Sequence, residues 1–199
     1  KMFDNILVPT NVLQNKINSI IQDNTNIIGI QIRTGDKYII TNQNDFGGVN
    51  GEKAHNALKV YTNTTSDNIE EYITMILRNI KEDFIKNNSV DMKKTKIFLT
   101  SDYNNIMQLV KNIWGHDTTL YNNDVVQHID RTPIYKDFSK TFVDLIILSK
   151  YCNYLYISPW SNYGKISYLS NSNVIYAKNI HNLKTITRNE IINNVKKST

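Results

Sequence analysis

The chain has 199 residues, of which 40% are hydrophobic and 21% charged, and its formal net charge at pH 7 is +5. This composition excludes a disordered tail, no apolar run reaches the roughly 18 residues of a membrane-spanning helix, and the length suits one domain over 1–199. The positive charge favours anionic partners, but the basic residues are dispersed and form no arginine-rich arm, so we expect no nucleic-acid binding.

The first predicted element is an amphipathic helix. Pro9 suits the first turn of a helix, and the apolar residues after it repeat at the spacing of one helical face: Leu13, Ile17, Ile20 and Ile21. We therefore expect residues 1–26 to form an N-terminal helical extension that packs on a sheet. The abrupt start at Lys1 predicts that the chain is a fragment of something longer.

The next segment, residues 27–36 with the sequence IIGIQIRTGD, is an apolar run that ends in charged residues. Such a run predicts a buried strand that carries the guanidinium of Arg33 and the carboxylate of Asp36 to the point where the chain leaves the sheet. In an open parallel sheet, ligands bind at that edge. The alternative is that Arg33 is an ordinary charged residue at the end of a core strand.

Helices and strands alternate after an Asn-, Gly- and Thr-rich segment that extends to about residue 65. Residues 69–84 have the helical period, and residues 96–100 form a short apolar strand. A helix over 106–115 and a strand over 118–121 follow.

The last third of the chain continues this alternation. Residues 139–152 predict a helix so apolar, Phe142 included, that it should be largely buried. The elements predicted after it are a strand at 154–158, a helix at 165–170, a strand at 173–177 and a C-terminal helix at 187–199. Alternating strands and helices predict parallel pairing through right-handed crossovers. The expected fold class is therefore α/β, a three-layer Rossmann-like sandwich with a mostly parallel sheet of about five strands.

Three polar segments then share one edge of the predicted sheet: residues 33–36, Ser101 with Asp102, and residues 160–164. Arg33 offers a planar fork of donors that can hold a diphosphate bidentately. Ser161 and Asn162, at the expected start of a helix, add hydroxyl, amide and backbone N–H donors for the same anion. Together these groups describe a diphosphate clamp.

Asp144 is the one carboxylate within the apolar helix and needs a partner there. Guanine is one candidate, because it presents two adjacent donors to a carboxylate, and a lysine or a neighbouring element is the other. The four histidines are scattered and no Asp-x-Asp occurs, so we expect no metal site and no cofactor. A clamp of arginine and backbone donors could neutralise a diphosphate leaving group by itself.

These segments resemble the fucosyltransferase superfamily. Residues 28–34, Ile-Gly-Ile-Gln-Ile-Arg-Thr, are similar to its arginine motif, and Gln31 resembles the version in plant xyloglucan α-1,2-fucosyltransferases. Residues 97–102 resemble the second motif. Residues 144–149, followed by a strand and by Trp160-Ser161-Asn162-Tyr163-Gly164, resemble the third, in which Asn162 replaces a threonine.

The resemblance implies the C-terminal, nucleotide-binding half of a GT-B-type glycosyltransferase that transfers fucose from GDP-fucose to a glycan hydroxyl, with inversion and without metal. It implies that Arg33 holds the β-phosphate, that Ser161 and its neighbours Trp160, Asn162 and Tyr163 contact the diphosphate, and that Asp144 contacts the guanine. Gln31, Ser101 and Asp102 would line the nucleotide side, and Asp36 would orient Arg33 or the sugar. An additional N-terminal domain would carry much of the acceptor site.

Two other interpretations stay open at this point. One is a non-catalytic module that keeps the nucleotide fold and recognises a nucleotide sugar, a glycan or a protein. The other is an unrelated Rossmann-like protein in which Arg33 pairs with Asp36 or another carboxylate. The localisation, cytoplasmic or on the lumenal side of the Golgi, would depend on the N-terminal region, and the acceptor stays open as well.

Overall fold

The computed structural model describes most of the predicted elements. The described residues are 8–22, 26–33, 69–89, 91–101, 106–115, 118–120, 122, 139–159 and 161–197. The long polar segment after Arg33 lies outside them.

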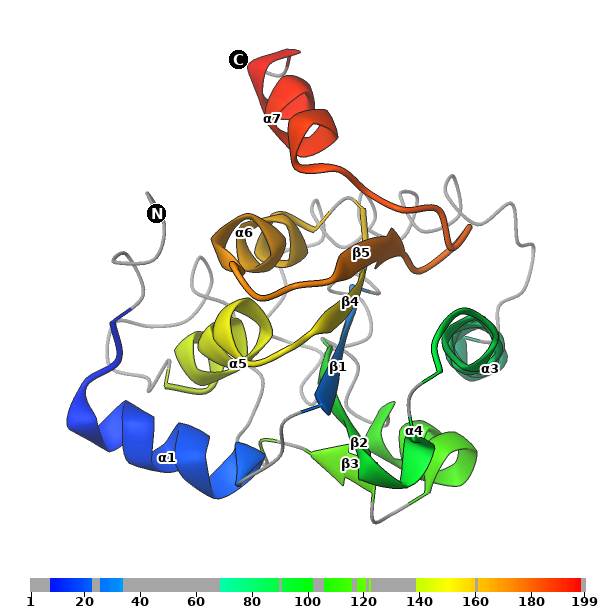
Figure 1. Ribbon diagram of the computed structural model, residues 1–199, viewed down its shortest axis with the longest axis horizontal. Helices are drawn as coiled ribbons and strands as arrows, with labels where there is room; N and C mark the ends of the chain where they lie inside the picture. Colours follow the sequence, from blue (N-terminus) through cyan, green and yellow to red (C-terminus); the bar gives the residue numbers. More distant parts are fainter. Residues whose placement is uncertain are drawn as a thin grey trace, which may run out of the picture.

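A five-stranded, all-parallel sheet forms the centre of the fold (Figure 1). Its strands are β1 (Asn26–Ile32), β2 (Thr95–Ser101), β3 (Thr119–Leu120), β4 (Tyr154–Ile157) and β5 (Tyr176–Asn179). Their order is β3-β2-β1-β4-β5, and every neighbouring pair is parallel. The predicted α/β class with a parallel sheet is confirmed.

Helices cover both faces of the sheet, as Figure 1 shows. The helices on one face are α1 (Asn11–Ile21), α5 (Ser139–Lys150) and α6 (Asn162–Ser170). Those on the other are α3 (Ile69–Asn87) and α4 (Ile106–Trp114), while α7 (Arg188–Lys197) follows β5. A short 3-10 turn, η2 (Met92–Lys94), precedes β2. No helix among the described residues has the length and apolar character to cross a membrane.

The two faces bury separate apolar cores because side chains alternate along a strand. On β1, Ile28, Ile30 and Ile32 pack with α3 and α4, whereas Ile27 packs with α1 and α5. Strand β4 divides in the same way: Tyr156 faces α3 and Leu155 faces α5. With both faces covered, β1 reads as a continuous apolar run and not as an alternating one.

Gly29 allows α5 to approach β1 closely. A Cβ atom at this position would lie 2.7 Å from Leu155 Cδ2 and 2.8 Å from both Cys152 Sγ and Leu148 Cδ2. Any side chain larger than hydrogen would therefore force these three buried side chains to shift in a closely packed core.

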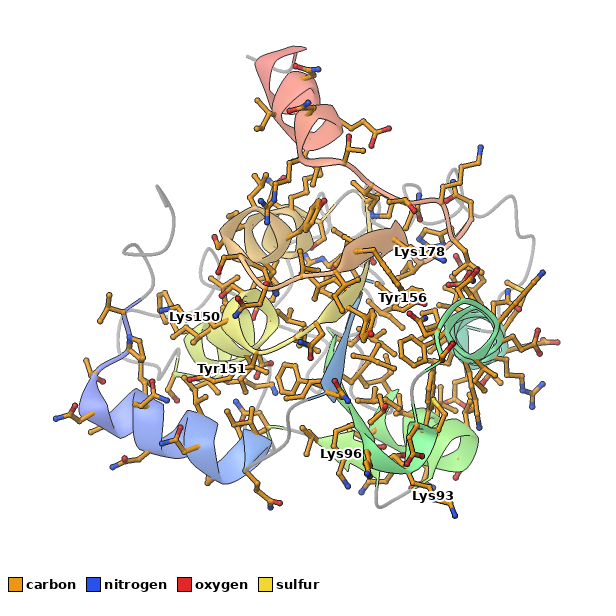
Figure 2. The ribbon with its side chains drawn as sticks, in the orientation of Figure 1. Lys93, Lys96, Lys150, Tyr151, Tyr156 and Lys178 are labelled. Carbon is orange, nitrogen blue, oxygen red and sulfur yellow. The ribbon has the colours of Figure 1, made fainter. Side chains whose placement is uncertain are left out.

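A network of polar side chains ties α3 to β4 and β5 on the opposite face. Lys178 Nζ lies 2.9 and 2.7 Å from the two carboxylate oxygens of Asp83, and both side chains are about nine-tenths buried, at 12% and 11% exposure. Tyr156 donates its hydroxyl to Asp83 Oδ2 at 2.8 Å and lies 3.0 Å from the Tyr176 hydroxyl. Figure 2 shows Lys178 and Tyr156 together beside α3.

Four local predictions need correction. Pro9 lies before the first helix, because Thr10 is its N-cap and accepts the Leu13 N–H. Phe142 is 43% exposed, since it lies on the face of α5 that points away from the sheet. Helix α6 begins at Asn162, earlier than 165, because Ser161 caps it.

The fifth strand lies at Tyr176–Asn179, later in the chain than the 173–177 that the sequence predicts. Asn171 explains the shift. Its side-chain amide donates to the carbonyls of Leu148 and Cys152 at 2.8 Å each, and its Oδ1 accepts the Asn173 N–H. These bonds hold the turn after α6 against the end of α5, so the strand begins only after that turn.

Candidate functional site

The sheet order creates a switch point between β1 and β4. From β1 the chain moves through β2 to β3 on one side, and from β4 to β5 on the other. In open α/β sheets, ligands bind outside the carboxyl ends of the two strands at such a point. Here those ends lead into Arg33 and into the turn after β4, in which the Ser161 N–H donates to the Ser158 carbonyl oxygen.

Hydrogen bonds join the two strand ends directly. The backbone N–H of Arg33 donates to Ser158 Oγ at 2.8 Å. The Ser158 N–H in turn lies 3.1 Å from the Gln31 carbonyl oxygen and 3.2 Å from Gln31 Oε1. The structure therefore brings Arg33 and the turn after β4 together at one edge of the sheet.

Ser161 begins helix α6 beside this junction. Its buried side-chain oxygen accepts the Gly164 N–H at 3.4 Å, and its backbone N–H donates to Ser158 O at 3.1 Å. The hydroxyl hydrogen of Ser161 is not used in that cap, and a hydroxyl can donate while it accepts. The exposed Asn162 follows in the first turn, so the positive end of the α6 dipole faces the same edge as Arg33.

Gly164 allows α6 to approach β1. A Cβ at this position would lie 2.7 Å from Gln31 Oε1 and 3.1 Å from Ile157 Cβ. Gln31 is 4% exposed, and its side chain bonds to Ser158. The expectation that Gln31 lines the nucleotide directly is therefore corrected: its amide orders the turn that follows β4.

Asp144 is paired inside the protein. Its carboxylate lies 3.2 Å from Lys140 Nζ and accepts from Thr100 Oγ1 at 3.0 Å and Asn122 Nδ2 at 3.1 Å. Burial raises the pKa of the Asp144 carboxyl, and the Lys140 ammonium opposes that shift. Of the two partners expected for Asp144, a lysine or guanine, the structure shows the lysine. A contact with guanine would need this network to open.

Tyr163 also points away from the edge. Its hydroxyl donates to the Thr141 carbonyl oxygen on α5 at 2.8 Å, and burial raises its pKa well above the ordinary value. The predicted diphosphate contact by the Tyr163 side chain is therefore corrected, because that side chain packs α6 on α5.

The remaining predicted site residues divide into two groups. Ser101 ends β2 beside Ile32, one strand away from the switch point. Asp36, Asp102 and Trp160 lie outside the described residues, and their roles stay predictions. Within the described ranges, no three His, Cys, Asp or Glu side chains gather in a way that could hold a metal ion.

Sequence reasoning missed Ser158, which it assigned to the strand. The hydroxyl of Ser158 nevertheless makes the contact that joins the two strand ends. A signal was present: a serine directly before Pro159 stands where a strand must end, because proline cannot continue the ladder.

His181 lies in the turn after β5, and its Nδ1 forms a short hydrogen bond with the Tyr72 hydroxyl. Burial lowers the pKa of His181 to about 4. Between that value and its ordinary pKa of about 6.5, the unfolded chain binds a proton that the folded chain excludes. The contribution of the neutral His181 to the free energy of unfolding is thus fully present above about pH 6.5 and is lost as the pH falls towards 4.

We expect the free energy of unfolding to fall by about 2 kcal/mol more between pH 7 and pH 4 in the wild type than in His181→Gln. This figure is below the full linkage value because the imidazole is partly exposed. Urea titrations at both pH values measure the difference. Since the carboxylates titrate equally in both proteins, identical pH dependence would contradict the assignment to His181.

Comparisons with known proteins found similar solved structures only. No family model matches the chain, and no curated protein matches it. The crystal structure of the α-1,6-fucosyltransferase NodZ co-crystallised with GDP has 13% identity and a TM-score of 0.47, covering 85% of this chain and 44% of that one. Fucosyltransferase NodZ from Bradyrhizobium has 14% identity and a TM-score of 0.49, covering 89% and 47%. The chain spans about half the length of these structures.

Proposed function

We propose that this chain is the nucleotide-sugar-binding part of a glycosyltransferase whose donor is GDP-fucose. The resemblance of residues 28–34 and 144–164 to the fucosyltransferase motifs supports this proposal. The chain would then be the C-terminal half of a GT-B-type enzyme, as a single domain with its helical extension at 1–26. A further domain would complete the acceptor site.

The observation that carries the proposal is the junction of Arg33 with the turn after β4, measured by the 2.8 Å bond from the Arg33 N–H to Ser158 Oγ. It supports a site in which a guanidinium and the amino end of α6 meet one diphosphate. Arginine binds two phosphate oxygens at once, and helix-end N–H groups bind a third. These groups act where negative charge increases as GDP leaves.

In the proposed transfer, a glycan hydroxyl attacks the anomeric carbon of fucose. A new carbon–oxygen bond forms, the bond to the β-phosphate oxygen breaks, and GDP departs with the electron pair. Direct displacement inverts the anomeric centre. The hydroxyl proton passes to a base, and Asp36 is the carboxylate that the sequence places nearest to the clamp. Arg33 stabilises the charge on the leaving diphosphate.

We expect Arg33→Ala to weaken GDP binding by about 2 kcal/mol, roughly thirtyfold, because a charge-assisted bidentate contact is lost. Isothermal calorimetry with GDP, ADP and UDP measures both the loss and the preference for guanine. Arg78→Ala, on the exposed face of α3, is the matched control. An isotherm that Arg33→Ala leaves unchanged, or equal affinity for the three nucleotides, would sink the proposal.

A further inference from the structure

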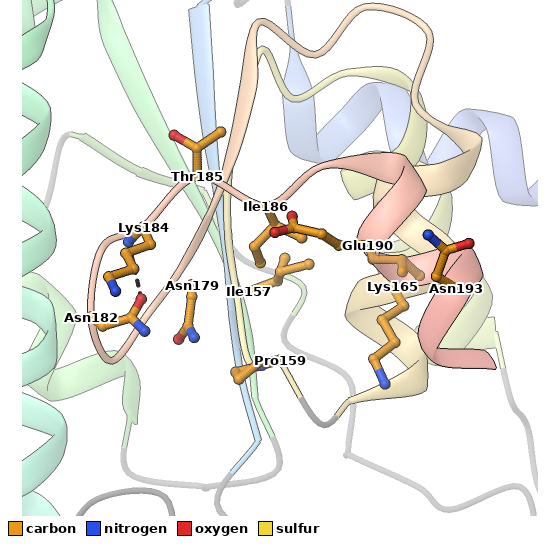
Figure 3. A pocket seen from close by; sticks show the side chains of 11 residues that line it. Ile157, Pro159, Lys165, Asn179, Asn182, Lys184, Thr185, Ile186, Glu190 and Asn193 are labelled. Atoms are coloured by element: carbon orange, nitrogen blue, oxygen red, sulfur yellow. Dashed lines mark hydrogen bonds between the residues drawn. The ribbon is translucent and has the colours of Figure 1, made fainter. Parts of the chain in front are cut away.

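A cavity of about 530 Å³ lies next to the proposed clamp, between the turn after β4, the loop after β5 and helices α6 and α7. Figure 3 shows Lys165 and Asn193 on one side of it and Asn182 and Lys184 on the other. Its volume is in the usual range for a small-molecule site. The proposed clamp does not use these residues.

Two asparagine side chains in this cavity accept backbone hydrogen bonds through their amide oxygens, which leaves their NH₂ groups available as donors. Asn179 Oδ1 accepts the His181 N–H at 2.9 Å, and Asn182 Oδ1 accepts the Lys184 N–H at 3.0 Å. Each bond fixes the orientation of the amide. The Nδ2 groups of Asn179 and Asn182 have no hydrogen-bond partner in the described part of the chain. The cavity therefore offers two oriented N–H donors.

The charged groups make the cavity electropositive. Lys165 and Lys184 each bring an ammonium group. The one carboxylate in the lining, Glu190, is already engaged, because its Oε2 accepts from Thr187 N at 2.6 Å and from Thr187 Oγ1 at 2.9 Å. These bonds lower the pKa of Glu190, so its carboxylate stays ionised, and the lining with two lysines and one glutamate still carries a net positive charge. A ligand for such a lining must supply acceptors and negative charge.

The lining argues against a nucleobase. It contains no aromatic side chain on which a base could stack, and no carboxylate that is free to read guanine. A sugar ring needs no stacking platform, and its hydroxyls accept from amide donors. The cavity adjoins the switch point, because Pro159 in its lining directly follows Ser158.

We propose that this cavity binds a sugar residue that carries a carboxylate or a sulfate group. Lys165 would hold the oxyanion on one side of the cavity, Lys184 would add positive charge on the other side, and Asn179 and Asn182 would donate to ring hydroxyls. If the proposed transferase function holds, on which this role rests, the sugar belongs to the acceptor, and the enzyme modifies an acidic glycan.

The test uses three monosaccharides that differ only at the sixth carbon: galacturonate, galactose 6-sulfate and galactose. Each is titrated into the chain and followed by saturation-transfer NMR. We expect at least one acidic sugar to bind about tenfold more tightly than galactose. The double variant Lys165→Gln/Lys184→Gln should remove this preference. Whichever acidic sugar binds identifies the anion.

The control is Lys93→Gln/Lys94→Gln, which removes the same charge from η2 at the amino end of β2, on the opposite edge of the sheet. An equal loss in this control, no preference for an acidic sugar, or displacement of the sugar by GDP would overturn the inference. Failure of GDP to bind, with lysine-dependent sugar binding intact, would remove the transferase proposal and the acceptor role while the cavity assignment stood.

Discussion

Replacing Lys178 by methionine should lower the free energy of unfolding by about 3–5 kcal/mol. The substitution leaves the Asp83 carboxylate, only 11% exposed, without the ammonium that lies 2.7 Å from it. The Tyr156 hydroxyl and the Asn87 amide, which also donate to Asp83, are neutral and cannot balance its charge. Methionine keeps the apolar volume of the lysine stem, so the effect measures lost pairing and not a cavity. Urea titration at pH 7 measures it.

Two controls isolate the ion pair. Lys86→Met removes the same charge from an exposed position on α3 and should change stability by less than about 0.5 kcal/mol. Adding Asp83→Leu to Lys178→Met removes the orphaned carboxylate and should restore part of the loss, because a pair replaced by apolar groups is often nearly neutral. If Lys178→Met costs no more than Lys86→Met, the network does not hold α3 on the sheet.

Replacing Gly29 by valine should cost about 3 kcal/mol, although valine is the better strand residue. Local propensity predicts a gain at this position. The packing predicts the reverse, because the new Cβ alone would meet Leu155, Cys152 and Leu148 at 2.7 to 2.8 Å. Relief of these contacts requires that the three fully buried side chains shift within a packed core. Thermal and urea unfolding both report the change.

The same substitution at the start of the strand provides a matched comparison. Asn26→Val should be neutral within about 0.5 kcal/mol, because Asn26 is the one partly exposed residue of β1. In the double variant Gly29→Ala/Leu148→Ala, the second change makes room for the new methyl group, so the combined loss should be smaller than the sum of the single losses. Additive losses, or stabilisation by Gly29→Val, would show that α5 does not rest on this glycine.

The lesson for site prediction lies in the contrast between Arg33 and Asp144. Arg33 could be placed at a sheet edge from the sequence, because an apolar run that ends in a charge has one physical explanation in an α/β chain. The carboxylate of Asp144 in an apolar helix had two possible explanations, a contact with a ligand or a partner inside the protein. Lys140 is four residues away on the same helix, and this spacing brings two side chains together. The partners Thr100 and Asn122 are far from it in sequence and could not be identified.

Periodicity alone predicted the helices, four of the five strands and the parallel α/β class, because the apolar residues of each element recur at the spacing of its buried face. Only the folded chain decided the strand order, the register of β5, the exposure of Phe142 and the bond between Arg33 and Ser158, which are 125 residues apart. The local sequence pattern indicates that the apolar face of a helix or strand must be buried. Which distant segment covers it depends on the shape and hydrogen bonding of every neighbour at once.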